Sequence, residues 1–154
     1  MTPLRLVLNL LWLVCGGLLM ALGWLLAAVL MVVTIIGIPW ARAAWTIGVF
    51  ALWPFGREAV DREELTGRGD LGTGPLGTVG NLVWLLLAGL WLGLGHAMAA
   101  IGLALTIIGL PFAWQHLKLA AVSLWPIGKT IVPVEIAAWA RRRVDFGRFD
   151  PSYR

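Results

Sequence analysis

The two histidines and the single cysteine are the side chains of this chain best suited to chemistry near neutral pH. His96 and His116 lie 20 residues apart, and the short hairpins predicted below would place them near opposite faces of a membrane. A joint metal site is therefore not expected. His96 stands as a candidate gate, or as an interfacial ring in place of a tryptophan. Cys15 lies alone in an apolar run, where it is interpreted as a small packing residue.

Two short motifs resemble binding sequences but lack the context that binding requires. Gly72, Gly74 and Gly77 have the spacing of a dinucleotide-binding turn, which needs a preceding strand and a βαβ unit that this sequence does not predict. The tripeptide Arg68-Gly69-Asp70 has no adhesion partner on a cytoplasmic linker. The sequence contains no Ser-His-Asp arrangement and no set of metal ligands. We expect no enzyme activity, no catalytic residue, no cofactor and no metal.

Composition and charge place the chain in a bilayer. Hydrophobic residues make up 60% of it and charged residues only 13%, against about 25% in ordinary soluble domains. No charged residue occurs between Arg5 and Arg42, or between Asp70 and Lys118, and each gap exceeds the roughly 20 residues that cross a hydrocarbon core. These gaps also lack the carboxylates that coupled transporters commonly use. The net charge of +4 is not gathered on a basic, aromatic surface, so nucleic acid is not expected as a partner.

The chain is a tandem duplication. The hexapeptide Thr-Ile-Ile-Gly-Ile-Pro at 34–39 returns as Thr-Ile-Ile-Gly-Leu-Pro at 106–111, an offset of 72. About 20 of the 49 positions from 9 to 57 are identical to their partners without a gap, well above the roughly one in ten expected by chance. The predicted organisation is a first repeat at 4–57, a polar cytoplasmic linker at 58–78, a second repeat at 79–130, and a basic C-terminal helix and tail at 131–154.

The fold class expected is an all-α membrane protein in which each repeat is a helical hairpin followed by an interfacial helix. The favoured interpretation turns the chain at Gly23-Trp24 and Gly95-His96, which gives four short transmembrane spans. The alternative joins residues 6–33 into one long tilted helix with 40–53 as the returning span. With short hairpins all twelve Lys and Arg residues fall on one side, so both termini and the linker are expected in the cytoplasm. The repeats would then be parallel rather than inverted.

Several residues are expected to anchor or pack these elements. The segments 40–53 and 112–125 are predicted to lie in the interface. Close helix packing is predicted at Gly17, Ala21, Gly89 and Gly93, which repeat a small-xxx-small spacing. The predicted lipid headgroup anchors are Arg57, Lys129, Arg141, Arg142 and Arg143.

The residues around the two hexapeptides resemble a known family. The features are an Asn-Leu-x-Trp start, a Leu-Gly-Trp segment, Thr-Ile-Ile-Gly-Ile-Pro, and a Leu-Trp-Pro-x-Gly ending before Arg or Lys, present twice around Val60-Asp61 and Glu64-Leu65. They resemble the bacterial YccF family of inner-membrane proteins over residues 4–143. The resemblance implies a multi-pass protein of the bacterial inner membrane with no established activity, and it supplies no functional residue.

Two functions remain open from the sequence. One is a structural or accessory membrane component that docks a larger membrane partner and contacts anionic phospholipids of the bilayer. The alternative is a small homo-oligomeric channel with helix breaks near its path. The candidate gate or pore residues are Gly37, Pro39, Gly109, Pro111, His96, Asn9 and Asn81. Convergence of Asn9, Asn81, Thr34, Thr106 and His96 on one water-accessible axis would favour the channel.

Overall fold

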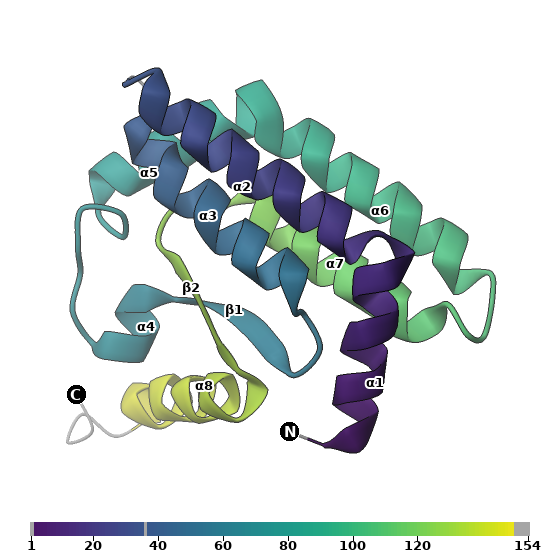
Figure 1. The fold of residues 1–154 in the computed structure, drawn as a ribbon. Helices are drawn as coiled ribbons and strands as arrows, with labels where there is room; N and C mark the ends of the chain where they lie inside the picture. The colour runs from purple at the N-terminus through teal and green to yellow at the C-terminus, as the bar shows by residue number, and fades with distance from the viewer. Residues whose placement is uncertain (1, 36, 150–154) are drawn as a thin grey trace.

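The computed structural model describes residues 2–35 and 37–149, and these form two helical hairpins above a short antiparallel ladder (Figure 1). Part of the predicted C-terminal tail, 150–154, lies outside the described residues. The elements in chain order are α1 (Pro3–Trp12), the π-helical turn η1 (Leu13–Gly17), α2 (Leu18–Val33), α3 (Ile38–Leu52), β1 (Arg57–Asp61), α4 (Arg62–Thr66), α5 (Pro75–Trp84), the π-helical turn η2 (Leu85–Gly89), α6 (Leu90–Ala104), α7 (Leu110–Leu124), β2 (Lys129–Pro133) and α8 (Val134–Phe149).

Each hairpin has a long limb and a shorter return limb. Among the described residues, 3–33 and 75–104 are the two stretches long and apolar enough to cross a membrane, with mean hydropathies of 2.4 and 1.8. The predicted turns at Gly23-Trp24 and Gly95-His96 are wrong, because both positions lie inside α2 and α6. A glycine inside an apolar helix costs only about 1 kcal/mol relative to alanine, which does not end a helix. The long-helix alternative is therefore closer to both repeats, although the first limb is kinked at Gly16, whose φ is 131°.

The chain reverses instead at the repeated hexapeptide. At Gly37 an added Cβ would meet the backbone of Met31 at 2.7 Å, and the same collision occurs between Gly109 and Leu103. Pro39 and Pro111 then occupy the first turns of α3 and α7, where a missing N–H costs nothing. We call these reversals the tips of the hairpins, and the opposite ends, around 9 and 55 or 81 and 127, their bases.

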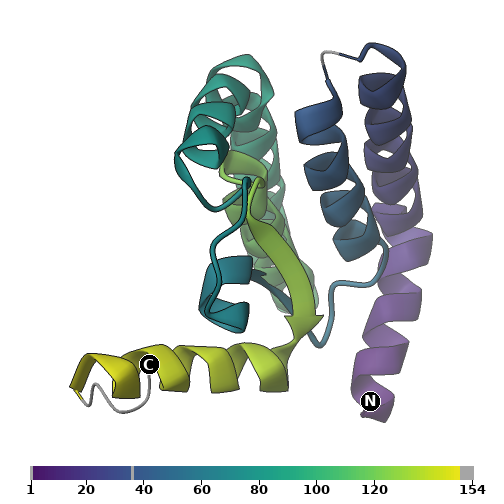
Figure 2. The ribbon, with the colours of Figure 1, turned by 90° about the vertical axis from the view of Figure 1, so that its left-hand side faces the viewer.

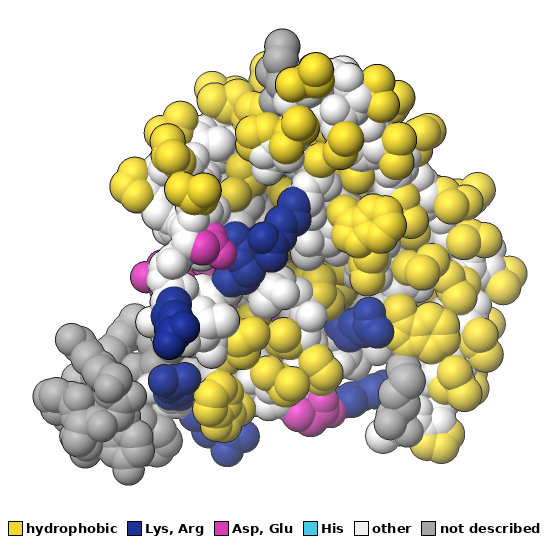
Figure 3. Space-filling view, turned by 60° about the vertical axis from the view of Figure 1, so that its left-hand side comes forward, with side chains coloured by type: hydrophobic (Ala, Val, Ile, Leu, Met, Phe, Trp, Pro, Cys, Tyr) yellow, Lys and Arg dark blue, Asp and Glu magenta, His cyan; other side chains and the backbone are white. Residues whose placement is uncertain are grey.

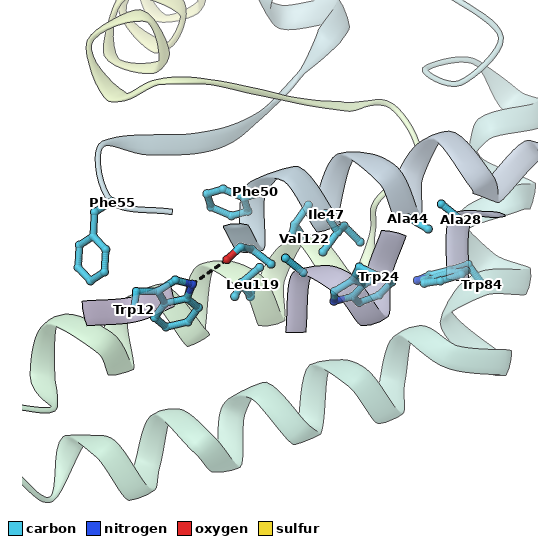
Figure 4. Close-up of a cluster of buried hydrophobic side chains, with 12 residues drawn as sticks. Trp12, Trp24, Ala28, Ala44, Ile47, Phe50, Phe55, Trp84, Leu119 and Val122 are labelled. Atoms are coloured by element: carbon cyan, nitrogen blue, oxygen red, sulfur yellow. Dashed lines mark hydrogen bonds between the residues drawn. The ribbon is translucent and has the colours of Figure 1, made fainter. Parts of the chain in front are cut away.

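The segments predicted as interfacial helices are the return limbs. α3 and α7 are helical as expected, but they carry much of the buried core, including Ile47, Phe50 and Leu119. Figure 4 shows these side chains between the limbs, with the Trp24 and Trp84 rings 6.1 Å apart. The burial of residues in α3 and α7 explains why these segments are no more than moderately amphipathic.

The prediction of a helical fold holds for most of the chain, but it missed β1 and β2, which form an antiparallel pair. Part of the predicted loop at 58–78 is β1, and the rest includes α4 and the start of α5. The two strands are far apart in sequence, so no local hairpin pattern indicates their pairing. The predicted C-terminal helix does begin at Val134, directly after Pro133, and extends to Phe149.

The two hairpins run in opposite directions. At the base of the first hairpin Trp12 stacks on Phe112 from the tip of the second, with ring centroids 6.4 Å apart. At the other end Trp40, next to the first tip, donates from Nε1 to the carbonyl of Gly80 at the second base, at 2.9 Å. Figure 2 shows the two hairpins side by side with α8 beneath them. Each tip therefore lies beside the base of the other hairpin.

A pseudo-two-fold axis relates the hairpins. The ladder pairs Ala59 with Ile131 at its centre, and these residues are equivalent positions of the two repeats. The axis that exchanges two antiparallel strands is perpendicular to their ladder. On one side of the ladder α3 packs on β2 and α7 on β1, and on the other side α8 packs on both strands. The layers along the axis are thus α8, the ladder and the hairpins.

Charge is distributed unevenly along this axis. α2 and α6 contain no charged residue, whereas β1, α4, the following loop and α8 hold most of the charged residues. Figure 3 shows Lys, Arg, Asp and Glu gathered towards the strands and α8, and hydrophobic side chains covering the hairpins. The molecule accordingly has a polar face and an apolar body.

Candidate functional site

Asn9 and Asn81 close the bases of the two hairpins. Asn9 Nδ2 donates to the carbonyl of Phe55 at 3.1 Å, and the Phe55 N–H donates back to Asn9 Oδ1 at 3.0 Å. Asn81 and Ile127 exchange the same two bonds, each 2.9 Å long. Both asparagines are almost fully buried. They join the start of a long limb to the end of its return limb, and they do not face an open path.

Tryptophans add a second pair of bonds one turn deeper. Trp12 Nε1 donates to the carbonyl of Ala51 at 2.7 Å, the dashed line of Figure 4, and Trp84 Nε1 donates to that of Ser123 at the same distance. Each bond satisfies a carbonyl near the C-terminal end of a return limb. The spacing of asparagine and tryptophan, which recurs in both repeats, thus has a structural cause.

The small residues predicted to pack helices lie at close contacts, but the contacts differ. A Cβ on Gly17 would collide with the Trp12 indole of its own limb. A Cβ on Gly89 would likewise meet the Trp84 indole at 2.9 Å, and also the Ser123 carbonyl of α7 at 3.0 Å, whereas Gly93 faces Leu124 of α7. Ala21 is fully buried. In three of the four positions the neighbour is thus identified, and in two of them it is the return limb.

The Gly-Pro breaks lie at opposite ends of the molecule, because the tips do. Each tip satisfies its own backbone through a threonine. Thr34 Oγ1 donates to the carbonyl of Met31 at 2.9 Å and accepts from the Gly37 N–H at 3.3 Å. Thr106 makes the equivalent bonds to Leu103 and Gly109 at 3.1 and 3.0 Å. Around these bonds the exposed side chains are apolar, as at Ile35 and Ile107.

His96 and His116 meet, contrary to the sequence prediction. His96 lies in the middle of α6 rather than at a turn, and its Nδ1 is 3.1 Å from that of His116 in α7. At that distance one ring donates to the other, with the roles set by the tautomers. The prediction failed because it rested on the wrong turn. Among the described residues no group of three or more His, Cys, Asp or Glu side chains is arranged to hold a metal ion.

The predicted headgroup anchors lie on the polar face, and two of them are already in ion pairs. Lys129 Nζ is 2.8 Å from Asp61 across the ladder, and Arg141 binds Glu58 at 2.6 Å. Arg142 and Arg143 are exposed, and the Arg143 guanidinium lies over the Trp139 ring. Arg57 begins β1, and its carbonyl accepts a bond from Lys118.

A groove of about 730 Å³ opens between α3 and α5, near the first tip and the second base. Trp40, Ala43, Leu76, Val79 and Val83 give it apolar walls, and its polar rim carries Arg42, Arg62, Asp70 and Lys129. Arg62 donates from Nε and Nη2 to the two Asp70 oxygens, both at 2.7 Å. This pair holds the pKa of Asp70 well below its usual range.

The position related to this groove by the two-fold axis is filled. There Phe112, Phe55 and Trp12 pack on one another with centroids 5.7 to 6.4 Å apart. Lys118, the equivalent of Thr46, donates from Nζ to the carbonyls of Pro54 and Arg57 at 3.0 and 2.8 Å. The two repeats therefore form one closed contact and one open contact.

Sequence reasoning missed Arg42, Lys118 and this asymmetry. The signal was present in the repeat alignment, where the open contact has Arg42, Gly77, Gly80 and Ile127 and the closed contact has Trp114, Arg5, Leu8 and Phe55. These differences between the repeats can be interpreted only once the antiparallel arrangement is known, because that arrangement brings residues near 40 into contact with residues near 80.

Comparison with known proteins gives two kinds of match. The family model described as the YccF inner membrane component domain matches residues 7–57 and again 79–129. Inner membrane protein YccF of Escherichia coli (strain K12) is 41% identical over 150 residues, covering 96% of this chain and all of that protein. The protein of the same name from Shigella flexneri matches equally. No solved structure gives a significant match. The resemblance read from the doubled motif is thereby confirmed.

Proposed function

Because this chain belongs to the YccF family of inner membrane components, we propose that it is a structural or accessory membrane component embedded through its two hairpins from the cytoplasmic side. Both termini, the linker and the β1–β2 ladder would face the cytoplasm. The observation that carries the proposal is the pseudo-two-fold axis with charged residues at one end and an uncharged body at the other.

The axis is best aligned with the membrane normal. In that orientation the polar face meets water and headgroups while α2 and α6 meet hydrocarbon, which avoids the cost of charges in lipid. The exposed indoles of Trp45 and Trp114 lie on the return limbs, between the charged layer and α2 and α6, as expected of side chains at the interface. The basic residues of the polar face fit the cytoplasmic side by the positive-inside rule.

This orientation lays the hairpins within the bilayer. A two-fold axis reverses the direction of a helix only when the helix is perpendicular to the axis. The antiparallel limbs, whose arrangement Figure 1 shows, are therefore perpendicular to it. α3 and α7, with 15 residues each, are about 22 Å long, short of a core of about 30 Å. The tips, with apolar side chains and backbone bonds made by threonine, are suited to hydrocarbon.

Four crossings, the number predicted from the sequence, are less favoured because of β1. If the antiparallel hairpins crossed the membrane, their bases would lie at opposite surfaces. β1 starts at the first base and ends beside the second, so five residues, about 17 Å when extended, would have to join those surfaces. Glu58 and Asp61 would also enter the hydrocarbon. A chain that is multi-pass in that sense would expose one tip to the periplasm and the other to the cytoplasm.

An accessory role is favoured over a channel by the placement of the polar residues. The side chains of Asn9 and Asn81 form hydrogen bonds within their own hairpins. Thr34 and Thr106 bond to backbone groups at the tips, and His96 bonds to His116. They do not converge on a common axis. The wide apolar faces of α2 and α6 instead offer contact to lipid, to a second copy or to a larger membrane partner.

Reconstitution and reporter fusions test this proposal. Purified protein in liposomes is expected to give no ion flux above that of empty liposomes across pH and voltage, with its oligomeric mass measured on the same sample. Reporters fused after Gly69 and after the C-terminus are expected to show cytoplasmic activity. Flux that His96→Ala abolishes while the oligomer persists would instead support the channel, and a periplasmic linker would overturn the orientation.

A further inference from the structure

We propose that the groove between α3 and α5 binds one anionic phospholipid, with its phosphate at Arg42 and an acyl chain along the apolar walls. This inference rests on the membrane placement proposed above, and it adds a defined site and ligand class to it. Lipid is the occupant that fits because the groove joins a cationic rim to apolar walls at the boundary between the polar face and the apolar body.

Size and lining suit such a ligand. The groove volume of about 730 Å³ lies within the roughly 300 to 1,000 Å³ of typical ligand sites. Its walls come from both repeats, with Trp40 and Ala43 on α3 and Leu76, Val79 and Val83 on α5. Gly80, whose carbonyl accepts the Trp40 indole bond, lines the groove without a side chain. A flexible chain can therefore lie between the limbs.

Charge at the rim selects an anion. Three cations line the groove, and two of them already have partners: Arg62 binds Asp70, and Lys129 binds Asp61. Arg42 is exposed and forms no ion pair with any described residue. Among the described residues that line the groove, Asp70 is the one acidic side chain, and the Arg62 guanidinium neutralises it through both carboxylate oxygens. Arg42 is left to bind a phosphate, for which its planar fork is suited.

The closed contact is an internal comparison. There Phe55 and Phe112 fill the space, Lys118 bonds to backbone carbonyls, and Arg5 pairs with Glu135 at 2.7 Å. In the open contact Ile127 replaces Phe55, and glycines replace Arg5 and Leu8. In the closed contact, side chains of the chain itself thus fill the space that is a groove in the open contact. The open contact lacks those side chains and carries instead Arg42, which has no ion-pair partner among the described residues, and this points to an external anionic ligand.

Native mass spectrometry of the purified, delipidated chain tests the site. Wild-type protein is offered phosphatidylglycerol or phosphatidylcholine with the same acyl chains. One phosphatidylglycerol per chain is expected to remain bound under activation that removes phosphatidylcholine. Arg42→Gln should weaken this retention about tenfold, the scale of one lost charge-assisted bond. Arg68→Gln, which removes a cation outside the groove, should leave it unchanged.

A second variant fills the groove. Ile127→Phe introduces the side chain that closes the other contact, and it keeps the backbone groups that bind Asn81, so the hairpin base should stay intact. It is expected to lose the bound lipid while retaining Arg42. Inorganic phosphate alone should not displace the lipid.

Three results would overturn the site. These are equal retention of the two lipids, equal behaviour of Arg42→Gln and Arg68→Gln, or a dimer that holds no lipid and is broken by Ile127→Phe. Because binding is measured in detergent, these results do not depend on orientation in the membrane. The failure of the site is thus distinguishable from failure of the membrane placement, which reporter position and tip accessibility test.

Discussion

Ala59 and Ile131 face each other at the centre of the antiparallel ladder, and they are the same position in the two repeats. The pair therefore lies on the pseudo-two-fold axis that exchanges the hairpins. A duplicated unit that pairs with its own copy through equivalent residues makes a self-complementary contact, as two subunits do in a symmetric dimer. The orientation of the whole molecule follows from the direction of this axis.

A cross-link tests the ladder and its register. The backbone bonds from Arg62 to Gly128 and from Val134 to Gly56 flank the strands, and alternation then makes Ala59–Ile131 a non-hydrogen-bonded pair, with a Cα separation of about 4.5 Å. That distance suits a disulfide. With Cys15→Ser, Ala59→Cys combined with Ile131→Cys should oxidise readily, as seen by mass spectrometry. Ala59→Cys with Thr130→Cys should not, because adjacent side chains point to opposite faces. Equal oxidation of both would disprove the register.

Asn9→Ala should destabilise the protein. It removes both bonds to Phe55 and leaves a buried N–H and C=O without partners, at a cost of about 2–4 kcal/mol in the free energy of unfolding. Asn81→Ala should cost a similar amount. Leu10→Ala, at a half-exposed neighbouring position, is the control and should stay within about 1 kcal/mol. Steric trapping or denaturation in detergent measures these differences. An Asn9→Ala protein as stable as its control would show that the base is not held by this bond pair.

Gly16 is predicted to be the bend of the first long limb. It has φ of 131°, a left-handed conformation that side chains disfavour, and Ala88 replaces it in the second repeat. Gly16→Ala should cost about 1–3 kcal/mol, or straighten the limb and separate Arg5 from Glu135. Gly23→Ala is the matched control, since its Cβ meets open space within a helix, and it should stabilise by about 0.5–1 kcal/mol. Thermal unfolding of the two variants should therefore shift in opposite directions.

The Arg62–Asp70 pair should give the loop before α5 a pH dependence. Two hydrogen bonds from Arg62 lower the pKa of Asp70 below its ordinary value of 3.8. For a lowered carboxyl pKa, the stabilisation is present above the ordinary value and is lost as pH falls towards the folded one. The stability difference between wild type and Asp70→Asn should thus be constant from neutral pH to about pH 4 and shrink below it. With Arg62→Gln the Asp70 carboxyl, followed by NMR, should titrate near its ordinary pKa, and an unchanged titration would contradict the pair.

Sequence reasoning identified the repeat, the breaks at the hexapeptides and the membrane class, because these depend on local composition and on identity between copies. It misplaced the turns because Gly23 and Gly95 permit a turn without requiring one. The reversal needs the close approach of Gly37 to Met31, which only the folded backbone reveals. It missed β1 and β2 because each strand pairs with a segment of the other repeat.

The candidate site was less predictable than the fold. Asn9, Asn81 and the tips were singled out as polar or irregular features of apolar spans, but their partners are backbone groups that the sequence does not indicate. His96 and His116 were separated by an assumed turn, and an unbroken α6 brings them together. Arg42 and the groove depend on a contact between residues 40 and 80, which arises only from the antiparallel hairpins.

The most direct test of the account is whether the tips reach the periplasm. Ile35→Cys and Ile107→Cys, each with Cys15→Ser, are treated in intact spheroplasts with a membrane-impermeant maleimide, beside Gly69→Cys in the linker and an unrelated periplasmic cysteine protein. The account predicts that neither tip is labelled, and that Gly69→Cys is labelled only after the membrane is opened. Labelling of either tip in intact spheroplasts would contradict embedded hairpins and show that the labelled tip reaches the periplasm.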